Sequence, residues 1–386
     1  MQSARELFAS RFGGDATQVL SVPGRINLIG EHIDYHDLPV MPIAVQRRIE
    51  IAFRANDDRV VRIESAGYSP RCRVLHGLAD ANRTPGDWGN YLSAAVAIAA
   101  THWPLTQGID AVITSDLPPA AGLSSSSAVL IGITLALLAA NGVGTDFNEL
   151  MNVFPEGEQL VGTRGGGMDH AAILGASPGS ALLIRFAPLE LKAIPAPVDW
   201  AFLAAHSLTT AEKSGSARAE YNSRREAGSA ALLKTGFSSF REALRYPSGE
   251  LTRRARQAGL NPDELGCFLH VISEAERVEG AVTAMERADA EEFGNLLCAS
   301  HASLRDQLCV SNPALDELAA CAMQCGATGA RLTGAGFGGY VIILCTMANR
   351  ERVRAGLVER FYSGRAGFDS ESHLFFAEPS AGVLFA

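Results

Sequence analysis

The chain has 386 residues, which exceeds the usual size of one hydrophobic core, so we expect two domains. Its formal net charge of −9 argues against a surface that binds nucleic acid or an anionic membrane. The 38 Gly and 17 Pro are spread along the sequence, which argues against a long disordered linker or a low-complexity tract.

The seven cysteines are odd in number and scattered, without the paired C-x-x-C spacing of zinc or redox sites. We therefore expect reduced thiols in a cytoplasmic protein. The N-terminus has no apolar signal core, and the longest apolar stretch, 128–140, is too short to span a bilayer. We therefore expect a soluble, intracellular protein, and the sequence leaves the oligomeric state open, with a monomer compatible.

Residues 4–12 predict a short amphipathic helix, and the segment 20–35 that follows places charged groups within an apolar stretch. Its polar residues are Arg25, Asn27, Glu31, His32 and Asp34. Burying such groups is costly unless they find partners. The segment is therefore either a solvated loop or a set of groups held for a polar ligand.

Two strands are predicted next, at 40–53 and 60–65. Residues 87–91 then begin an alanine-rich helix that runs to about His102. Trp88 stands at the beginning of this helix. On pattern alone it is a packing aromatic, which is the usual role of such a residue.

The stretch 118–128 joins a predicted strand, 109–114, to an apolar helix, 128–140. Its small residues let a ligand approach the backbone. Its serine hydroxyls and the free N–H groups of the first helical turn attract an anion such as a phosphate. The alternative is a serine cluster that only caps a buried helix.

Three consecutive glycines, 165–167, precede Asp169 in the segment 158–170. Glycines permit a close approach of backbone to substrate and could direct the Asp169 carboxylate into a site. On pattern alone the segment could equally be a plain turn with a capping aspartate.

A change in composition places the domain boundary between residues 185 and 200, and helices dominate from there to about residue 325. A strand is expected at 200–206. The segment 220–225 is either a surface helix or part of a binding site. The glycine-rich stretch 334–339 joins two predicted strands and could be an ordinary hairpin.

Three motifs resemble those of a known family. Residues 24–35 resemble the galactokinase signature, the serine loop resembles the second motif of the GHMP kinase superfamily, and residues 329–339 resemble the third. They follow the family's order across nearly the full length. The resemblance implies an α/β (α+β) protein with the two-domain GHMP kinase fold. Its domains would be 1–190 and 191–386, with the active site in the cleft between them.

The resemblance implies ATP-dependent phosphorylation of the anomeric hydroxyl of a sugar, with Mg²⁺ as the metal and D-galactose as the expected acceptor. The chain has His36-Asp37-Leu38 where most galactokinases have Asn-Gly-Gly. This loop is nearer in character to N-acetylgalactosamine kinases, so that sugar or a related one remains an alternative acceptor. A non-catalytic sensor of sugar and ATP is the second alternative, although such sensors tend to lose residues of the serine loop, which is intact here.

By this resemblance Arg25 and Asp169 form the catalytic pair. Phosphoryl transfer needs positioned reactants and neutralised phosphate charge more than covalent help from the protein. Asp169 would take or orient the proton of the anomeric hydroxyl. Arg25 would offset phosphate charge and lower the pKa of Asp169, which makes the carboxylate a weak base.

The resemblance also implies the other site residues. The sugar ligands are Glu31, His32, Asp34, Gly166 and Tyr221. The ATP-binding residues are Trp88, for the adenine, and Gly122, Leu123, Ser124, Ser125, Ser126 and Ser127, for the phosphates. Magnesium would be held by Glu158 and by a serine hydroxyl, Ser125 or Ser126, of which we take Ser126.

Overall fold

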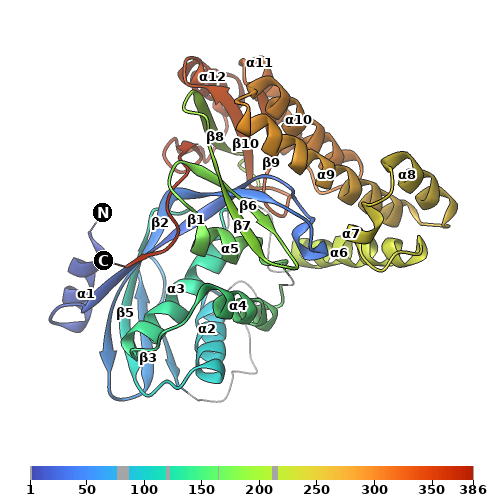
Figure 1. Ribbon diagram of the computed structural model, residues 1–386. Coiled ribbons are helices and arrows are strands. Elements are labelled where there is room, and N and C mark those ends of the chain that lie inside the picture. Colours follow the sequence, from blue (N-terminus) through green and yellow to red (C-terminus); the bar gives the residue numbers. More distant parts are fainter. Residues whose placement is uncertain (1, 76–86, 119–121, 164, 211–215, 386) are drawn as a thin grey trace.

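The structure is a computed structural model that describes residues 2–75, 87–118, 122–163, 165–210 and 216–385 (Figure 1). Residues 119–121 and 164, which belong to the predicted serine and glycine loops, lie outside the described residues. Helices alternate with the strands of a six-stranded, a four-stranded and a two-stranded sheet, which confirms the predicted α/β (α+β) class.

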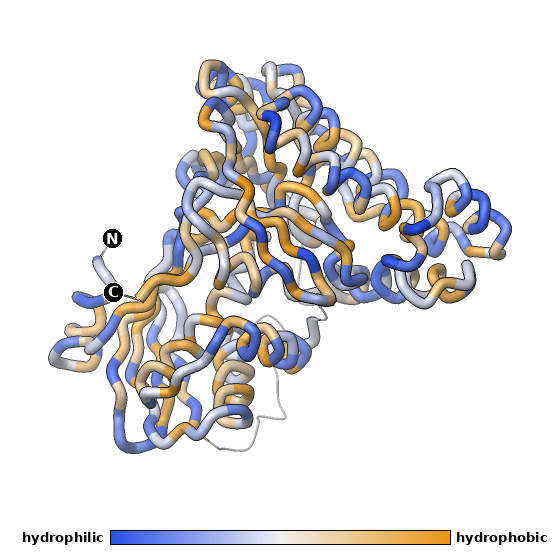
Figure 2. Tube along the Cα trace, viewed as in Figure 1, coloured by the Kyte–Doolittle hydropathy of each residue, from blue (hydrophilic) through white to orange (hydrophobic). Residues whose placement is uncertain are grey.

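The first sheet, within the described residues, has the strand order β12-β1-β2-β5-β3-β4, with β3 and β5 parallel and the other pairs antiparallel. Its strands are β1 (Gln18–Ile29), β2 (Met41–Asn56), β3 (Val60–Ser65), β4 (Arg71–Val74), β5 (Gly108–Ser115) and β12 (Leu384–Phe385). Figure 2 shows these central strands as mostly apolar, as expected for strands covered by helices.

Helices cover both faces of this sheet because successive strand residues point to opposite sides. One face carries α2 (Gly89–His102), α3 (Ser125–Ala140), α4 (Phe147–Val161) and α5 (Met168–Gly175). Gly132 of α3 packs directly against Ile51 of β2. The neighbouring Ala52 faces the other side, where it packs in a separate cluster with Phe8 of α1 (Ala4–Phe12).

The second sheet is antiparallel, with the order β11-β8-β10-β9. Its strands are β8 (Trp200–His206), β9 (Gly329–Leu332), β10 (Tyr340–Thr346) and β11 (Leu374–Ala377). The helices α9 (Pro262–Glu286) and α10 (Ala290–Asp306) belong to the cluster that holds Phe202 and Ile342. The helices α11 (Pro313–Gln324) and α12 (Arg350–Leu357), the latter followed by a π-helical turn (Val358–Tyr362), pack with Leu203 and Ile343 on the opposite face.

Several segments join the two sheets. The hairpin of β6 (Ser180–Arg185) and β7 (Glu190–Pro195) bridges to β2 through Val40 and Ile184 and also packs against α9. The helices α6 (Ser216–Lys234), α7 (Phe240–Ala243) and α8 (Ser248–Gln257) project from the body (Figure 1). The last strand, β12, returns to pair with β1. The division into 1–190 and 191–386 therefore stays a prediction, because 190 falls at the start of β7.

Most predicted elements are present with small shifts. The helix 4–12 and the strands 60–65 and 200–206 have the predicted bounds, and the helical region ends with α11 at Gln324. The apolar helix begins earlier than predicted, at Ser125, because the serines form its first turn. No helix in the described part of the chain is long and apolar enough to cross a membrane.

Candidate active site

The segment 20–35 is a buried strand and turn rather than a solvated loop. Its charged side chains are nearly inaccessible: Arg25 is 6% exposed, Glu31 3% and Asp34 7%. β1 pairs with β2 with irregular register at two points, between Pro23 and Arg25 and again after Asn27. Such irregularities redirect side chains, so this strand can aim polar groups at one place while its apolar residues stay in the core.

An ion pair joins the buried Arg25 of β1 to the partly exposed Asp169 of α5. Arg25 donates to Asp169 Oδ1 from Nε at 2.7 Å, and its Nη2 lies 2.6 Å from the same oxygen. Arg25 Nη1 also donates to the carbonyl oxygen of Gly122 at 2.8 Å, and the hydroxyl of Ser124 donates to Asp169 Oδ2 at 2.5 Å. The segment 24–35 and the serine loop therefore meet at the carboxylate of Asp169.

The environment of Asp169 sets its protonation state. Burial raises the pKa of this carboxyl, but the Arg25 guanidinium and the Ser124 hydroxyl outweigh burial and leave the pKa below its usual value. Asp169 is therefore ionised at neutral pH and is a weak base, as predicted. It can orient a hydroxyl in contact with it and stabilise positive character on that hydroxyl's proton.

The serine loop turns sharply into α3. Gly122 and Ser124 both have left-handed backbones, with φ of 85° and 58°, and Leu123 between them is buried. The N–H groups of Ser125, Ser126 and Ser127 form the first turn of α3, where no intrahelical acceptor is available. Ser125 and Ser126 are half-buried. This helix end can bind a phosphate group through backbone N–H donors.

The glycine-rich turn of the third motif lies against this loop. A Cβ on Gly334, whose φ is 85°, would stand 3.3 Å from the carbonyl oxygen of Gly122. The turn connects β9 and β10, which pair antiparallel, so the hairpin interpretation also holds. The third motif therefore packs directly against the serine loop.

Glu158 of α4 contacts the same cluster. Its Oε1 accepts from the hydroxyl of Ser127 at 2.8 Å and lies 3.2 Å from Nε2 of His170. The Ser127 hydroxyl is also 3.3 Å from Asp169 Oδ2. Burial lowers the pKa of His170, but the Glu158 and Asp169 carboxylates outweigh this and leave it above its usual value. The serine in contact with Glu158 is thus Ser127, a neighbour of the predicted Ser126.

The oxygen atoms at this place fit magnesium. Mg²⁺ in kinase sites is commonly held by one or two carboxylates together with the phosphates of the substrate. Among the described residues no group of three or more His, Cys, Asp or Glu could hold a metal ion by themselves. Glu158 with a serine hydroxyl is the kind of partial ligand set that suits a metal brought in with a nucleotide.

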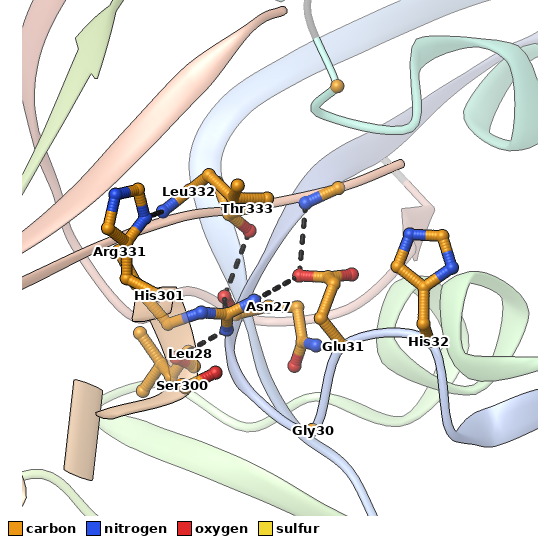
Figure 3. A network of polar contacts seen from close by, with 12 residues as sticks. Asn27, Leu28, Gly30, Glu31, His32, Ser300, His301, Arg331, Leu332 and Thr333 are labelled. Atoms are coloured by element: carbon orange, nitrogen blue, oxygen red, sulfur yellow. Dashed lines mark hydrogen bonds and ion pairs between the residues drawn. The ribbon is translucent and has the colours of Figure 1, made fainter. Parts of the chain in front are cut away.

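Glu31 links the turn that follows β1, residues 30–34, to the third motif, as Figure 3 shows. Its Oε2 accepts from Nη2 of the fully buried Arg331 at 2.6 Å and from the N–H of Gly334 at 3.0 Å. Arg331 also donates to the carbonyl oxygens of Asn27 and Leu28. The second Glu31 oxygen points toward His32 in Figure 3 and is not used in these bonds. One carboxylate oxygen thus fixes the side chain, and the other remains available as an acceptor.

His32 has both ring nitrogens engaged. Nε2 lies 3.1 Å from the carbonyl oxygen of Ala335, which can only accept, so this nitrogen carries the proton. Nδ1 then accepts from the Tyr35 hydroxyl, 3.0 Å away. Burial lowers the pKa of His32 to about 3, so the ring is neutral. Tyr221 of α6 brings its ring within 5.1 Å of the His32 ring.

Asp34 and Gly166 are in direct contact. Asp34 Oδ2 accepts from the N–H of Gly166 at 3.1 Å. A Cβ on Gly166 would stand 2.2 Å from the Asp34 carbonyl carbon, so only glycine fits. Burial raises the pKa of Asp34 to about 6, and the nearby Asp169 and Glu31 carboxylates add to the rise. The glycine triplet is thus a close approach of two chain segments rather than a plain turn.

Trp88 stands just before α2, outside the hydrogen-bonded cluster. It is half-buried, with the Arg71 guanidinium 5.9 Å from its ring centroid and the Tyr68 ring 6.3 Å away. It packs against the core, so the packing interpretation holds, and its role at the adenine stays a prediction.

Sequence reasoning assigned Ser127 only to the ATP phosphates, whereas its side chain also contacts Glu158. Three further residues of the site received no role. His170 contacts Glu158, and Arg331 holds Glu31. Glu274 of α9 accepts hydrogen bonds from the N–H groups of Gly30 and Glu31. A signal for Glu274 exists, since it lies at helical spacing within an otherwise apolar stripe of α9.

Comparison with known proteins places these motifs in a family. A model of the galactokinase galactose-binding signature matches residues 6–55, and models of the GHMP kinase N-terminal and C-terminal domains match residues 90–176 and 281–363. Galactokinase of Roseiflexus sp. (strain RS-1) is 34% identical over 93% of this chain and 91% of its own length. Galactokinase of Streptomyces coelicolor is 32% identical over 98% and 96%.

Solved structures agree. The crystal structure of Lactococcus lactis galactokinase complexed with galactose matches with a TM-score of 0.85 and 26% identity, over 98% of both chains. Methanococcus jannaschii mevalonate kinase shares the fold, with a TM-score of 0.64 at 17% identity over 94% of this chain and 98% of its own.

Proposed function

The chain belongs to the galactokinase family of the GHMP kinases, and on that premise we propose that it transfers the γ-phosphoryl group of ATP to the anomeric hydroxyl of D-galactose. The observation that carries the proposal is the contact of Arg25, Asp169 and Ser124, which joins the galactose-binding signature, the catalytic carboxylate and the serine loop. Sugar and ATP are its small-molecule substrates.

Asp169 and Arg25 perform the transfer step in this proposal. The ionised Asp169 holds the anomeric hydroxyl by accepting its proton in a hydrogen bond and takes that proton as the bond to phosphorus forms. Arg25 keeps Asp169 ionised and opposes the negative charge of the reacting phosphate. Because Asp169 is a weak base, most of the acceleration comes from positioning and from charge stabilisation.

The serine loop binds the phosphates through the backbone N–H groups at the beginning of α3, from Gly122 through Ser127. We assign the magnesium to Glu158 and the Ser126 hydroxyl, with Ser127 and His170 holding the Glu158 carboxylate in place. When bound, the metal neutralises charge on the phosphate oxygens. Trp88 is assigned to the adenine.

The sugar site is formed by the free oxygen of Glu31, the Asp34 carboxylate, Gly166 and Tyr221, with His32 shaping one wall. Each sugar hydroxyl needs a polar partner, because one left unpaired in a buried site costs about 1–3 kcal/mol. Glu31 is tied to the third motif on one side and Asp34 to the glycine triplet on the other. This supports a cleft between domains 1–190 and 191–386 as the place of reaction.

A substrate panel tests the proposal. ADP release from Mg·ATP is measured with galactose, N-acetylgalactosamine, glucose, arabinose, glucuronate and mevalonate, with Asp169→Asn as the control. We expect turnover of galactose that falls at least about 100-fold in the variant. Preference for N-acetylgalactosamine would transfer the specificity assignment to the loop His36-Asp37-Leu38. Binding of galactose and ATP without turnover would contradict the kinase proposal and favour a sensor.

A further inference from the structure

One helix outside the three motifs forms hydrogen bonds with the backbone of the proposed sugar-binding turn, residues 30–34. α9 carries His270 and Glu274, one helical turn apart and both fully buried. Glu274 Oε1 accepts from the N–H groups of Gly30, at 3.0 Å, and Glu31, at 3.3 Å. His270 Nε2 donates to the carbonyl oxygen of Glu31 at 2.9 Å. Three backbone groups of the turn are thus bound by two side chains of α9.

Glu274 is itself held firmly. The hydroxyl of Ser300 on α10 donates to Oε1 at 2.7 Å, and Nε of Arg277 donates to Oε2 at 2.7 Å. A buried carboxylate is costly unless it is paired and hydrogen-bonded, and this one meets both conditions. Burial raises its pKa, but Arg277, His270 and Arg331 outweigh burial and lower the pKa to about 2. The carboxylate is therefore a permanent acceptor for the turn.

The turn needs such an anchor because its backbone is unusual. Gly30 has φ of 94°, and a Cβ there would stand 2.9 Å from the Cα of Val40 and 3.0 Å from a methyl of Val278 on α9. Two residues later His32 has φ of 62°, a left-handed conformation that is unfavourable for a non-glycine residue. Hydrogen bonds from α9 offset this cost and select one conformation.

The position of the anchored backbone links it to ligand binding. Gly30 and Glu31 directly precede His32 and Asp34, and Figure 3 shows Glu31 between Arg331 and His32. Arg331 fixes the side chain of Glu31, whereas Glu274 fixes its backbone from the other side. A shift of this backbone by a fraction of an ångström would displace the carboxylates of Glu31 and Asp34, which face the sugar in the proposed site.

We propose that Glu274 is a positioning residue for sugar binding, which fixes the turn 30–34 through α9 so that Glu31, His32 and Asp34 meet the sugar together. The inference rests on the proposed function of this turn. It assigns a role in substrate affinity to a helix that none of the three motifs includes.

The test is Glu274→Gln in the full chain, with steady-state kinetics in which galactose and ATP are varied separately. Glutamine keeps the shape and one acceptor oxygen but removes the charge that two N–H groups and Arg277 share. We expect the KM for galactose to rise about 10-fold or more, with the KM for ATP changed less than about twofold. Glu264→Gln is the matched control, because Glu264 caps the same helix and pairs with Lys234, and it should leave both KM values unchanged.

A milder variant covers the case in which Glu274→Gln does not fold. Ser300→Ala removes one hydrogen bond to Glu274 Oε1 and should raise the KM for galactose about 3- to 5-fold, again without a matching change for ATP. Equal rises in both KM values, or an unchanged galactose KM with a lower melting temperature, would overturn the positioning role. Loss of galactose turnover in the wild-type chain would instead overturn the proposed function, and the inference with it.

Discussion

Asp169 and Asp34 differ in pKa because their neighbours differ. Asp169 has Arg25 and Ser124 as partners, which leave its pKa below the usual value. Asp34 is buried beside two other carboxylates, and its pKa rises to about 6. Asp169 is therefore ionised throughout the range around neutral pH, while Asp34 titrates at the acidic edge of that range.

The raised pKa of Asp34 predicts an acid limb in the sugar dependence. In the proposed sugar site the Asp34 carboxylate accepts hydrogen bonds from the sugar, so we expect kcat/KM for galactose to fall below about pH 6. Asp34→Asn should have lower activity without that limb. A limb that persists in the variant would contradict the assignment.

The same shift predicts a change in stability. Between the unfolded pKa near 3.8 and the folded pKa near 6 the folded state binds the proton more tightly, so stability falls as the pH rises through this window. The ionised carboxylate therefore costs stability at neutral pH. Asp34→Asn should raise the melting temperature at pH 8 and not at pH 4, measured by calorimetry. A lower melting temperature of the variant at pH 8 would count against a buried, disfavoured charge.

Ser127 predicts a specific change in metal dependence. Its hydroxyl donates to Glu158, and a hydrogen bond of this kind is worth about 1 kcal/mol. Ser127→Ala should therefore raise the free Mg²⁺ needed for half-maximal turnover about 5-fold. Thr134→Ala removes a buried hydroxyl from the same helix, where it bonds only to the Leu130 carbonyl, and should leave this value unchanged. An equal rise in both variants would point to α3 as a whole.

At the scale of elements, the site depends on close approaches between loops. The glycine triplet before α5 passes so near the β1 turn that Gly166→Ala would place a carbon 2.2 Å from the Asp34 carbonyl carbon and 2.3 Å from the Tyr35 nitrogen. The two segments must then separate. We expect kcat/KM for galactose to fall by about 10-fold or more in this variant.

The control for this substitution is Gly144→Ala. Gly144 lies in the loop before α4, where a Cβ would meet nothing within 4 Å. Its kinetics and melting temperature should match the wild type. Wild-type kinetics in Gly166→Ala would show that the approach of the two loops does not shape the sugar site.

Many of the helices and strands could be predicted from the sequence, because they depend on local patterns of residues. Periodicity predicts the helix 4–12 and the strands 60–65 and 200–206. Periodicity together with the small residues of the loop predicts the order of strand, serine loop and helix. Pattern alone left the segment 20–35 open between a solvated loop and a ligand site. Its burial depends on partners such as Arg331 and Glu274, which lie about 300 and 240 residues away in sequence.

The long-range partners were harder to predict for a physical reason. A charged residue on a long helix usually faces solvent, and only the position of Glu274 within an apolar stripe suggests otherwise. The contact between Ser127 and Glu158 likewise depends on how α3 and α4 pack, which no local pattern specifies. The residues that carry the chemistry could be predicted from motifs. The side chains that orient those residues could be identified only from the folded structure.

At the scale of the whole molecule, the chain's last residues complete its first half. β12 pairs with β1, and the tail leading to it is bound by backbone groups of the first half. Val383 and Gly382 donate to the carbonyl oxygens of Ile173 and Ala176, at the end of α5, while Arg48 of β2 donates to the Gly382 carbonyl. The helix that begins with the Asp169 segment is therefore fixed at its other end by this tail.

Truncation after Glu378 tests this connection. It removes several buried hydrogen bonds of about 1 kcal/mol each, so we expect the melting temperature to fall by on the order of 5 °C. Because α5 loses its partner, kcat should fall more than the KM for ATP changes. An unchanged melting temperature would mean that the tail only lies on the surface of the first sheet.

Identification of the product tests the proposed phosphorylation of the anomeric hydroxyl most directly. Galactose, Mg·ATP and the purified chain are incubated, and the product is examined by phosphorus NMR for coupling between the phosphorus and the anomeric proton, with methyl β-galactoside as a substrate whose anomeric oxygen is blocked. We expect galactose 1-phosphate from galactose and no product from the methyl glycoside. Phosphorylation of the glycoside, or a phosphorus coupled to the protons at carbon 6, would contradict it.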